Sequence, residues 1–247
     1  MSDTSTHARD YCADLVRQRD EDRWLAAQYA NENDCRRLFA LYAFQCELRR
    51  IPSAVSEPAL GEIRLQWWRE AFDEMRGGKP VRAHPVVEEL SAAGFGEAGF
   101  AEAIDAVIDA HARPLYGEGF GDIDDLSTWL GKTDGAVDAL ALAALGDAGL
   151  EGDAAKAVVD AGAGFALARE GRALAPPLAD EMPARALSIA DAARPALKQT
   201  PGAHAPAILH LALIRDYARR ARDGKDGRPF ATVKRLRLFA AMAFGWF

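Results

Sequence analysis

The sequence predicts an all-α protein, and two observations carry this prediction. Apolar residues recur at spacings of three and four along nearly the whole chain, which is the period of an α-helix. Alternating runs with a period of two are scarce, and β-branched residues never cluster for long, so strands have little support. Nothing resembling a linker or an internal repeat divides the 247 residues. We therefore expect a single domain over residues 1–247.

Residues that typically begin or end a helix divide the N-terminal half into separate helices. The cluster Asn31–Asp34 should end one helix and cap the next, and the turn at Gly77–Pro80 should end a third. We expect helices over the following stretches: Arg9–Tyr29, two helices within Leu38–Met75 separated by a loop with Pro52 and Pro58, Pro85–Leu90, and Ala101–Tyr116.

The C-terminal half reads in the same way. Ser127 or Thr128 should cap a helix that ends near Leu145, and Asp122, Asp124 and Asp125 precede that cap, where negative charge suits the helix dipole. Further helices are expected over Ala154–Leu174, Ala184–Thr200, Ala205–Arg222 and a basic and apolar tail at about 231–247.

Charge and cysteine content restrict the partners and the compartment. The formal net charge of −7 argues against nucleic acid as a partner. Cys12, Cys35 and Cys46 are an odd set without CxxC spacing, which is typical of a reduced cytoplasmic protein. The N-terminal residues lack the apolar run of a signal peptide, and no run of about 18 apolar residues occurs. We expect a cytoplasmic protein that is soluble or peripheral to a membrane.

The stretch Leu38–Met75 is the most informative part of the chain. Its first helix is apolar almost all the way round, which predicts burial on every side. Its second helix has a polar stripe, and we expect the opposite side, with Leu60, Ile63 and Trp68, to face the core. Arg64 projects from the middle of this apolar side. An unpaired buried charge is very costly, so Arg64 needs either Glu47 or an anionic ligand.

The same stretch carries a family resemblance. The quoted residues are Tyr42-Ala43-Phe44, Ser56-Glu57-Pro58, Gly61 to Glu70 and His84-Pro85-Val86. In these the sequence resembles the squalene/phytoene synthase family, and in particular the divergent branch that includes mitochondrial complex I assembly factors and their alphaproteobacterial relatives. The resemblance implies an isoprenoid-synthase-like helical bundle around a central cavity.

The resemblance also implies two aspartate-rich motifs that hold Mg²⁺ and the diphosphate of the substrate. In this sequence Arg49 and Arg50 stand where the first pair of aspartates is expected, and Ser53 stands near the next acid. Arg172 fits the arginine of the second motif, but Ala173 replaces its aspartate. We therefore expect no metal site, and Mg²⁺ as a cofactor only if the protein is an enzyme after all.

Several smaller features allow two interpretations. The stretch Ile214–Arg220 superficially echoes the second motif, although a solvated charged face is the plainer interpretation. Gly162 and Gly164 could lie against a ligand, but close packing of helices is the preferred explanation. His84 before Pro85 should serve a turn.

Three functional hypotheses follow. The first is a non-catalytic family member that acts in complex I assembly and retains a pocket for an isoprenoid or another lipid. The second is an active prenyl-diphosphate-condensing transferase of terpenoid biosynthesis with relocated acids such as Glu47, Glu57, Glu62 and Asp216. The third is a lipid-binding scaffold that associates with the membrane and has no link to complex I. The first and third imply possible contact with the inner membrane.

Two sets of candidate residues go with these hypotheses. The candidates for a ligand pocket are Tyr42, Glu47, Arg49, Arg50, Glu57, Arg64, Trp68 and Arg172. The candidates for membrane contact are Lys234, Arg235, Arg237, Phe244 and Trp246, because a basic helix with large apolar residues can lie in a membrane interface. Packing of the tail on the bundle is the alternative.

Overall fold

The computed structural model describes residues 2–146, 152–223 and 229–245, and every regular element within them is helical. This confirms the predicted all-α class. The chain forms two compact units, Met1–Glu118 and Gly119–Phe247, and we describe each by itself. The expectation of one domain over the whole chain stays a prediction.

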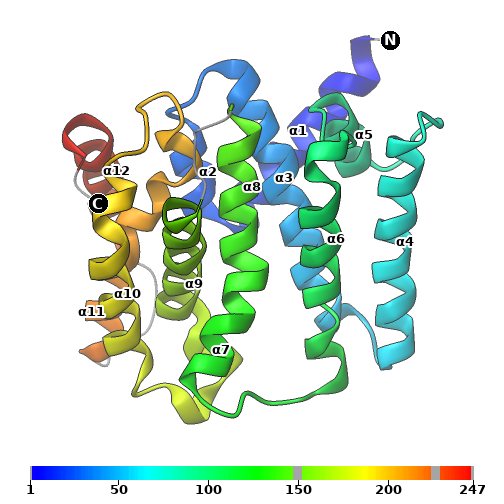
Figure 1. The fold of residues 1–247 in the computed structure, drawn as a ribbon. Helices are drawn as coiled ribbons and strands as arrows, with labels where there is room; N and C mark the ends of the chain where they lie inside the picture. Colours follow the sequence, from blue (N-terminus) through cyan, green and yellow to red (C-terminus); the bar gives the residue numbers. More distant parts are fainter. Residues whose placement is uncertain (1, 147–151, 224–228, 246–247) are drawn as a thin grey trace. The chain divides into compact units, whose positions relative to one another are not determined.

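The first unit contains six α-helices and three short 3₁₀ turns within its described residues (Figure 1). They are α1 (Ser2–Arg19), α2 (Glu21–Ala27), α3 (Glu32–Arg50), η1 (Pro52–Ala54), α4 (Pro58–Arg76), α5 (Pro85–Ala92), η2 (Ala98–Phe100), α6 (Ala101–Ala110) and η3 (Arg113–Tyr116).

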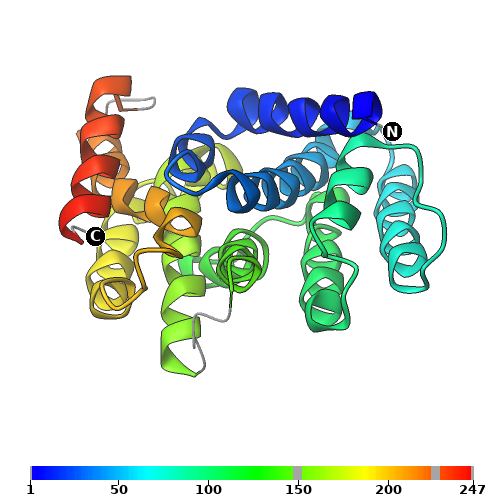
Figure 2. The same ribbon diagram turned by 90° about the horizontal axis from the view of Figure 1, so that it is seen from above.

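Helix α3 lies at the centre of this unit. It packs against α1, α2 and α5, and Figure 2 shows α1 running along it. All eight residues from Leu38 to Gln45 are buried, which confirms the predicted burial on every side. The helix begins where expected, because the Asn31 side chain accepts a hydrogen bond from the Asp34 backbone N–H at 3.0 Å.

The side of helix α4 that faces the core agrees only in part with the one we expected, since Trp68 is buried as predicted and Leu60 and Ile63 are not. Its buried residues include Gly61, Leu65, Trp68 and Phe72, at helical spacings of four, three and four. A Cβ atom at Gly61 would lie 2.3 Å from Cδ2 of Leu115, so this glycine brings α4 close to η3. This contact turns Leu60 and Ile63 outward, and they are 45% and 65% exposed. The prediction that both face the core is wrong.

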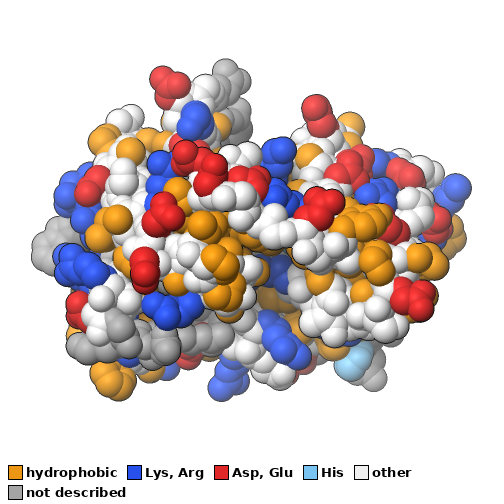
Figure 3. Space-filling view, turned by 90° about the horizontal axis from the view of Figure 1, so that it is seen from below, with side chains coloured by type: hydrophobic (Ala, Val, Ile, Leu, Met, Phe, Trp, Pro, Cys, Tyr) orange, Lys and Arg blue, Asp and Glu red, His pale blue; other side chains and the backbone are white. Residues whose placement is uncertain are grey.

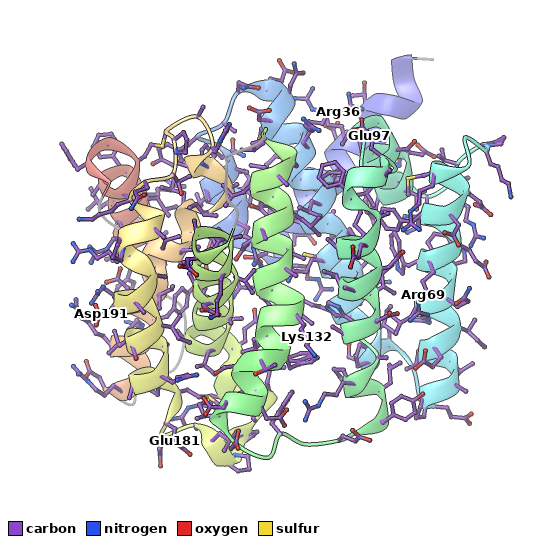
Figure 4. All side chains as sticks on the ribbon, viewed as in Figure 1. Arg36, Arg69, Glu97, Lys132, Glu181 and Asp191 are labelled. Carbon is purple, nitrogen blue, oxygen red and sulfur yellow. The ribbon has the colours of Figure 1, made fainter. Side chains whose placement is uncertain are left out.

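Ion pairs hold the outer helices of the first unit together. Arg69 of α4, labelled in Figure 4, donates to Oδ1 of Asp109 on α6 at 2.6 Å. Arg36 of α3 donates through Nε and Nη2 to both carboxylate oxygens of the buried Glu89 on α5, at 2.6 and 2.8 Å. The second pair is bidentate, which is the stronger arrangement for a guanidinium and a carboxylate.

The second unit is built around its long helix α9. The elements are α7 (Ile123–Leu130), a π-helical turn η4 (Gly131–Gly135), α8 (Ala136–Ala144), α9 (Asp153–Leu174), η5 (Pro176–Leu178), α10 (Met182–Leu197), η6 (Ala205–Ala207), η7 (Leu209–Leu213), α11 (Ile214–Arg222) and α12 (Ala231–Phe244). Helix α9 packs against α7, η4, α8, α10 and α11.

Glycines allow α9 to approach its neighbours at backbone distance. A Cβ atom on Gly162 would lie 2.6 Å from Cα of Gly135, and one on Gly135 would lie 2.1 Å from the carbonyl oxygen of Val159. Gly164 meets Ile189 of α10, where a Cβ would lie 2.8 Å from Cγ2. The expectation that Gly162 and Gly164 serve close packing of helices is confirmed.

A buried polar pair lies beside this contact. Nε2 of His210 on η7 lies 3.2 Å from Oδ1 of Asp138 on α8, and both side chains are fully buried. The His210 ring also packs edge-on against Phe165 of α9, with centroids 4.9 Å apart. Because an unpaired polar group in the core is costly, the pair links η7, α8 and α9 in one arrangement.

Three helix boundaries differ from those predicted. Asp20 interrupts the first predicted helix, because its side chain caps α2 by accepting from the Arg23 backbone N–H. Asp122, and not Ser127 or Thr128, caps α7, since its Oδ1 accepts from the Asp125 N–H at 2.8 Å. The stretch from residue 205 to 213 forms two 3₁₀ turns instead of an α-helix.

None of the helices in the described ranges combines the length and the apolar character that a membrane crossing requires.

We expect Gly135→Ala to lower the free energy of unfolding by about 1–3 kcal/mol, because the new methyl group would clash with the Val159 backbone. Gly131→Ala is the matched control. It lies in the same helical segment, and its Cβ would meet Cγ1 of Val159 at an ordinary 3.5 Å. Urea unfolding followed by circular dichroism measures both variants. Equal stability of the two would contradict the proposed backbone contact.

Candidate functional site

A pocket of about 250 Å³ in the first unit brings together several of the sequence-predicted residues. Helix α3 contributes its C-terminal end, α4 its middle, and the residue before α5 closes the third side. The lining residues are Glu47, Arg50, Ile51, Arg64, Trp67, Trp68 and His84. We call this the α3–α4 pocket.

Aromatic rings form the rigid wall of the α3–α4 pocket. Trp68 is buried and packs edge-on against Phe44 of α3, with centroids 5.1 Å apart. Trp67 meets Trp68 at 5.1 Å, and the His84 ring meets the two indoles at 5.4 and 5.5 Å. Edge-to-face contacts of this kind favour one fixed arrangement.

Glu47 is the acidic group of the pocket. Its side chain is 11% exposed, and its Oε1 accepts from Nη1 of Arg50 at 3.3 Å and from the Tyr11 hydroxyl at 3.4 Å. Burial raises the pKa of Tyr11, and the negative charge of Glu47 adds to this effect. The carboxylate is therefore already balanced by its own helix and by α1.

His84 lies in a partly buried position that favours its neutral imidazole. Burial lowers its pKa and outweighs the opposing attraction of Glu47 and Glu88, while Arg50 lowers it further. Its Nδ1 atom is buried and has no hydrogen-bond partner among the described residues. The backbone of His84 is extended, which suits a residue before proline, and it caps α5 without a side-chain hydrogen bond. His84 thus serves the expected turn and also lines the pocket.

Arg64 is not the buried cation that the sequence indicated. It is exposed, because α4 turns Gly61, Leu65 and Trp68 toward the core and leaves Arg64 to one side. Among the residues that the structure describes, no carboxylate forms an ion pair with it. The predicted buried pair of Glu47 and Arg64 is wrong, since the guanidinium bonded to Glu47 belongs to Arg50.

The other predicted pocket residues lie elsewhere. Tyr42 is in the core, 1% exposed, with the Arg23 guanidinium 5.5 Å from its ring centroid. Arg49 is half-buried on the last turn of α3, and Glu57 is the exposed residue before α4. Arg172 belongs to the second unit, where it is exposed on the last turns of α9.

The predicted membrane-contact residues also lie in different environments, some buried and some exposed. Lys234 is 1% exposed, with its ammonium 6.0 Å from the Tyr217 ring centroid. Arg237 donates from Nε to Oδ2 of Asp216 at 2.9 Å. Arg235 and Phe244 are exposed, and Trp246 lies outside the described residues. The expectation that Lys234 meets a membrane is wrong, because its side chain points into the second unit.

Arg82 is a residue that the sequence did not reveal. Its guanidinium lies 5.1 Å from the Trp67 ring centroid and donates to Glu70 and Glu74 at 2.8 Å each. These bonds raise the pKa of Arg82 and lower the pKa of both carboxyls. They fasten the loop before α5 to α4 and so hold His84 against the indoles. No local signal identifies this clamp, because it joins residues eight and twelve positions apart across a turn.

The donor set of the α3–α4 pocket suits an anion rather than a cation. Two guanidinium groups, Arg50 and Arg64, flank a single carboxylate that is already bonded. Mg²⁺ takes several hard oxygen ligands, so one carboxylate beside two cations does not fit it. Across the described part of the chain, no three His, Cys, Asp or Glu side chains gather in a way that could hold a metal ion.

The family model for squalene/phytoene synthase matches residues 16–176 of the 247. This is more than half of the chain. The chain belongs to the squalene/phytoene synthase family. The family match covers all of the α3–α4 pocket and reaches through α9.

Solved and curated relatives extend this assignment. A crystal structure of a dehydrosqualene synthase in complex with a ligand superposes with a TM-score of 0.69 over 97% of each chain, at 14% identity. At this identity the similarity shows the fold alone, and the fold is the helical isoprenoid synthase fold that the resemblance implied. The expectation of a central cavity within this fold stays a prediction.

Curated relatives named complex I assembly factor 6 match a shorter stretch. The protein from Bos taurus is 29% identical over 143 residues, which is 58% of this chain and 43% of that protein. The one from Rattus norvegicus is 30% identical over 136 residues, 55% of this chain and 40% of its own length. The human protein is 27% identical over 143 residues. The match thus spans less than half the length of these relatives.

The lowered pKa of His84 gives a pH-dependence with a defined sign. The folded protein favours neutral His84, so the unfolded chain takes up a proton first as the pH falls below about 6.5. We expect the free energy of unfolding to fall with pH in this window, and to fall less steeply in His84→Gln. Denaturant unfolding at a series of pH values measures the two slopes.

The control for this experiment is His7→Gln, which removes an exposed histidine from α1. It should leave the slope of the wild-type protein unchanged. The same slope in wild-type protein and in His84→Gln would contradict the role assigned to burial of the imidazole.

Proposed function

We propose that this protein is a non-catalytic member of the squalene/phytoene synthase family that acts in the assembly of respiratory complex I. Relatives at 27–30% identity that bear the name of a complex I assembly factor support the second half of this proposal. The matched stretch covers 40–43% of the length of these relatives.

The observation that carries the non-catalytic half is the charge at the C-terminal end of α3. Arg49 and Arg50 occupy the last turn of this helix, where the family's prenyl-condensing enzymes are expected to hold Mg²⁺ with aspartates. A guanidinium repels the metal and cannot ligate it. Arginines at this end of α3 can hold an anion, but they do not replace a metal ion that bridges the diphosphate oxygens and assists their departure.

The second motif supports the same conclusion. Arg172 and Ala173 are both exposed on the last turns of α9. The nearest acid, Glu170, accepts from Nε of its neighbour Arg169 at 2.8 Å. A single carboxylate that is paired to an arginine does not provide the several oxygen ligands that Mg²⁺ requires.

An active prenyltransferase with relocated acids is the alternative enzyme hypothesis. Three of the four proposed acids are engaged by their own neighbours, while Glu57 is the exposed residue before α4. Arg50 and Tyr11 bond Glu47, the Tyr116 hydroxyl donates to Glu62 at 3.0 Å, and Arg237 donates to Asp216 through two nitrogens. Recruiting them for Mg²⁺ would break these bonds, which favours the non-catalytic hypothesis.

We place the retained ligand site in the α3–α4 pocket. Its volume of about 250 Å³ is at the small end of ligand pockets and suits an anionic headgroup better than a long isoprenoid chain. Arg50 and Arg64 supply the positive charge, and the indole of Trp67 supplies a flat apolar wall. A lipid or isoprenoid ligand would bind here through its charged end.

Purified protein incubated with farnesyl or geranylgeranyl diphosphate and Mg²⁺ should release no diphosphate and form no squalene or phytoene. The physical reason is the pair of arginines in place of metal ligands. Product analysis by chromatography with a diphosphate-release assay makes the measurement, and an active dehydrosqualene synthase serves as the positive control. Turnover above the background without enzyme would sink the non-catalytic hypothesis.

Deletion of the gene in its native host should lower the amount of assembled complex I and its NADH oxidation rate, while squalene and phytoene levels stay the same. Native gel electrophoresis and lipid extraction measure the two effects. Tagged protein should also co-purify with complex I subunits. Normal complex I after deletion would instead favour a lipid-binding scaffold with no link to complex I.

A further inference from the structure

The outward side of α12 is an apolar surface of large side chains. On this helix and the residue before it, five large apolar residues are exposed by two fifths or more of their area. They are Phe230 at 72%, Val233 at 41%, Leu236 at 69%, Phe239 at 57% and Phe244 at 63%. We call these residues the α12 face. Exposed apolar patches of this kind mark sites of interaction.

The opposite side of α12 fixes the orientation of this surface. Lys234, Leu238 and Ala241 are buried at spacings of four and three, and the helix packs on η7. Arg237 ties the helix to α11 through its two hydrogen bonds with Asp216. The α12 face is therefore held outward by the packing of the second unit.

Arginines border the α12 face on both edges. At 100° per residue, Val233, Leu236 and Phe239 share one side of the helix, while Arg235 and Arg237 project from either edge of it. The guanidinium of Arg220 on α11 lies 5.7 Å from the Phe230 ring centroid, at the N-terminal end of the face. Long basic side chains at the edge of an apolar surface can reach anionic headgroups while the apolar residues insert.

The segments that contain α11 and α12 carry a charge of the opposite sign to that of the whole chain. Over residues 214–223 and 229–245, which contain α11 and α12, there are seven basic and two acidic residues, whereas the whole chain has a net charge of −7. Of the basic residues, Arg219, Arg222 and Arg235 are exposed. Figure 3 shows acidic, basic and hydrophobic side chains interspersed on the surface of the described residues. The concentration of positive charge at α11 and α12 complements an anionic surface.

We propose that the α12 face is the docking surface of this protein for an anionic lipid bilayer. The helix lies in the interface, with Leu236 and Phe239 inserted and Arg235 at headgroup level. A bilayer meets both requirements of the surface, apolar depth and negative charge, over the length of a fourteen-residue helix. A second copy of the chain fits less well, because a symmetric contact would bring the two basic surfaces together.

Vesicle flotation with the full-length purified protein tests this proposal. Wild-type protein should float with phosphatidylcholine vesicles that contain phosphatidylglycerol, and the bound fraction should fall as salt is added. Leu236→Ser/Phe239→Ser should weaken binding by at least about tenfold, since the two apolar side chains that insert into the bilayer are lost. Arg235→Glu should weaken binding to anionic vesicles about tenfold and should not change binding to neutral ones.

Ile63→Ser is the matched control. Ile63 is a 65% exposed apolar residue on α4 in the first unit, and its replacement should leave vesicle binding unchanged. Circular dichroism checks that every variant is folded. Equal binding by wild-type protein and Leu236→Ser/Phe239→Ser would overturn the proposal, and so would an equal loss in Ile63→Ser.

Light scattering tests whether a second copy of the chain, instead of a bilayer, covers the α12 face. A wild-type dimer that dissociates in the double variant would assign the α12 face to self-association and overturn the proposal. Because the assay contains no complex I subunit and no prenyl diphosphate, its result does not depend on the proposed function. Vesicle binding can fail while the proposed assembly role holds. Equally, the assembly role can fail while vesicle binding holds.

Discussion

The burial of α3 on every side is the constraint on which the first unit depends. A helix enclosed by α1, α2, α5 and the rings of α4 cannot carry charged groups along its middle, because each would need a buried partner. Charge is therefore confined to its ends. Arg36 reaches Glu89 at one end, and Glu47, Arg49 and Arg50 gather at the other. Polar chemistry on this helix is therefore restricted to its ends, and the α3–α4 pocket lies at the C-terminal one.

The second unit meets a similar requirement with small residues and one polar pair. The contact of Gly135 with Gly162 and Val159 removes side chains from the crossing of η4 and α9. Asp138 and His210 then fill the space next to it with groups that satisfy one another. Shape and polarity together select a single packing, since neither a larger residue nor an unpaired polar group fits there. This fixed core is also what orients α12.

Much of the fold could be predicted, because local signals determine it. The Asn31 cap, the proline that begins α4 and the all-round apolar pattern of α3 are each readable within a few residues. The sequence also shows Arg49 and Arg50 at positions where the resemblance implies aspartates. These features need no knowledge of the neighbouring helices.

The site was less predictable, because side-chain direction depends on contacts far along the chain. The close approach of Gly61 to Leu115, 54 positions later, decides which side of α4 is buried, and so leaves Arg64 exposed. The same holds for Lys234, which enters the core of its unit instead of the surface. Arg82 clamps Trp67 across a turn that the sequence marks only as Gly-Gly-Lys-Pro. The sequence of an amphipathic helix shows that one face is buried, but packing against neighbouring elements determines which face it is.

The π-helical turn η4 changes the direction in which side chains point around the helix axis between α7 and α8. A π-turn holds one residue more than an α-turn, so the side chains after it are rotated by about 100° from where an uninterrupted helix would place them. Lys132, labelled in Figure 4, is exposed within this turn, while Thr133, Asp134 and Gly135 directly after it are buried. Deleting a single residue here would shift the register of α8 and move Asp138 away from His210. The extra residue of the π-turn is thus a structural requirement of the second unit, although the backbone stays helical from α7 through α8.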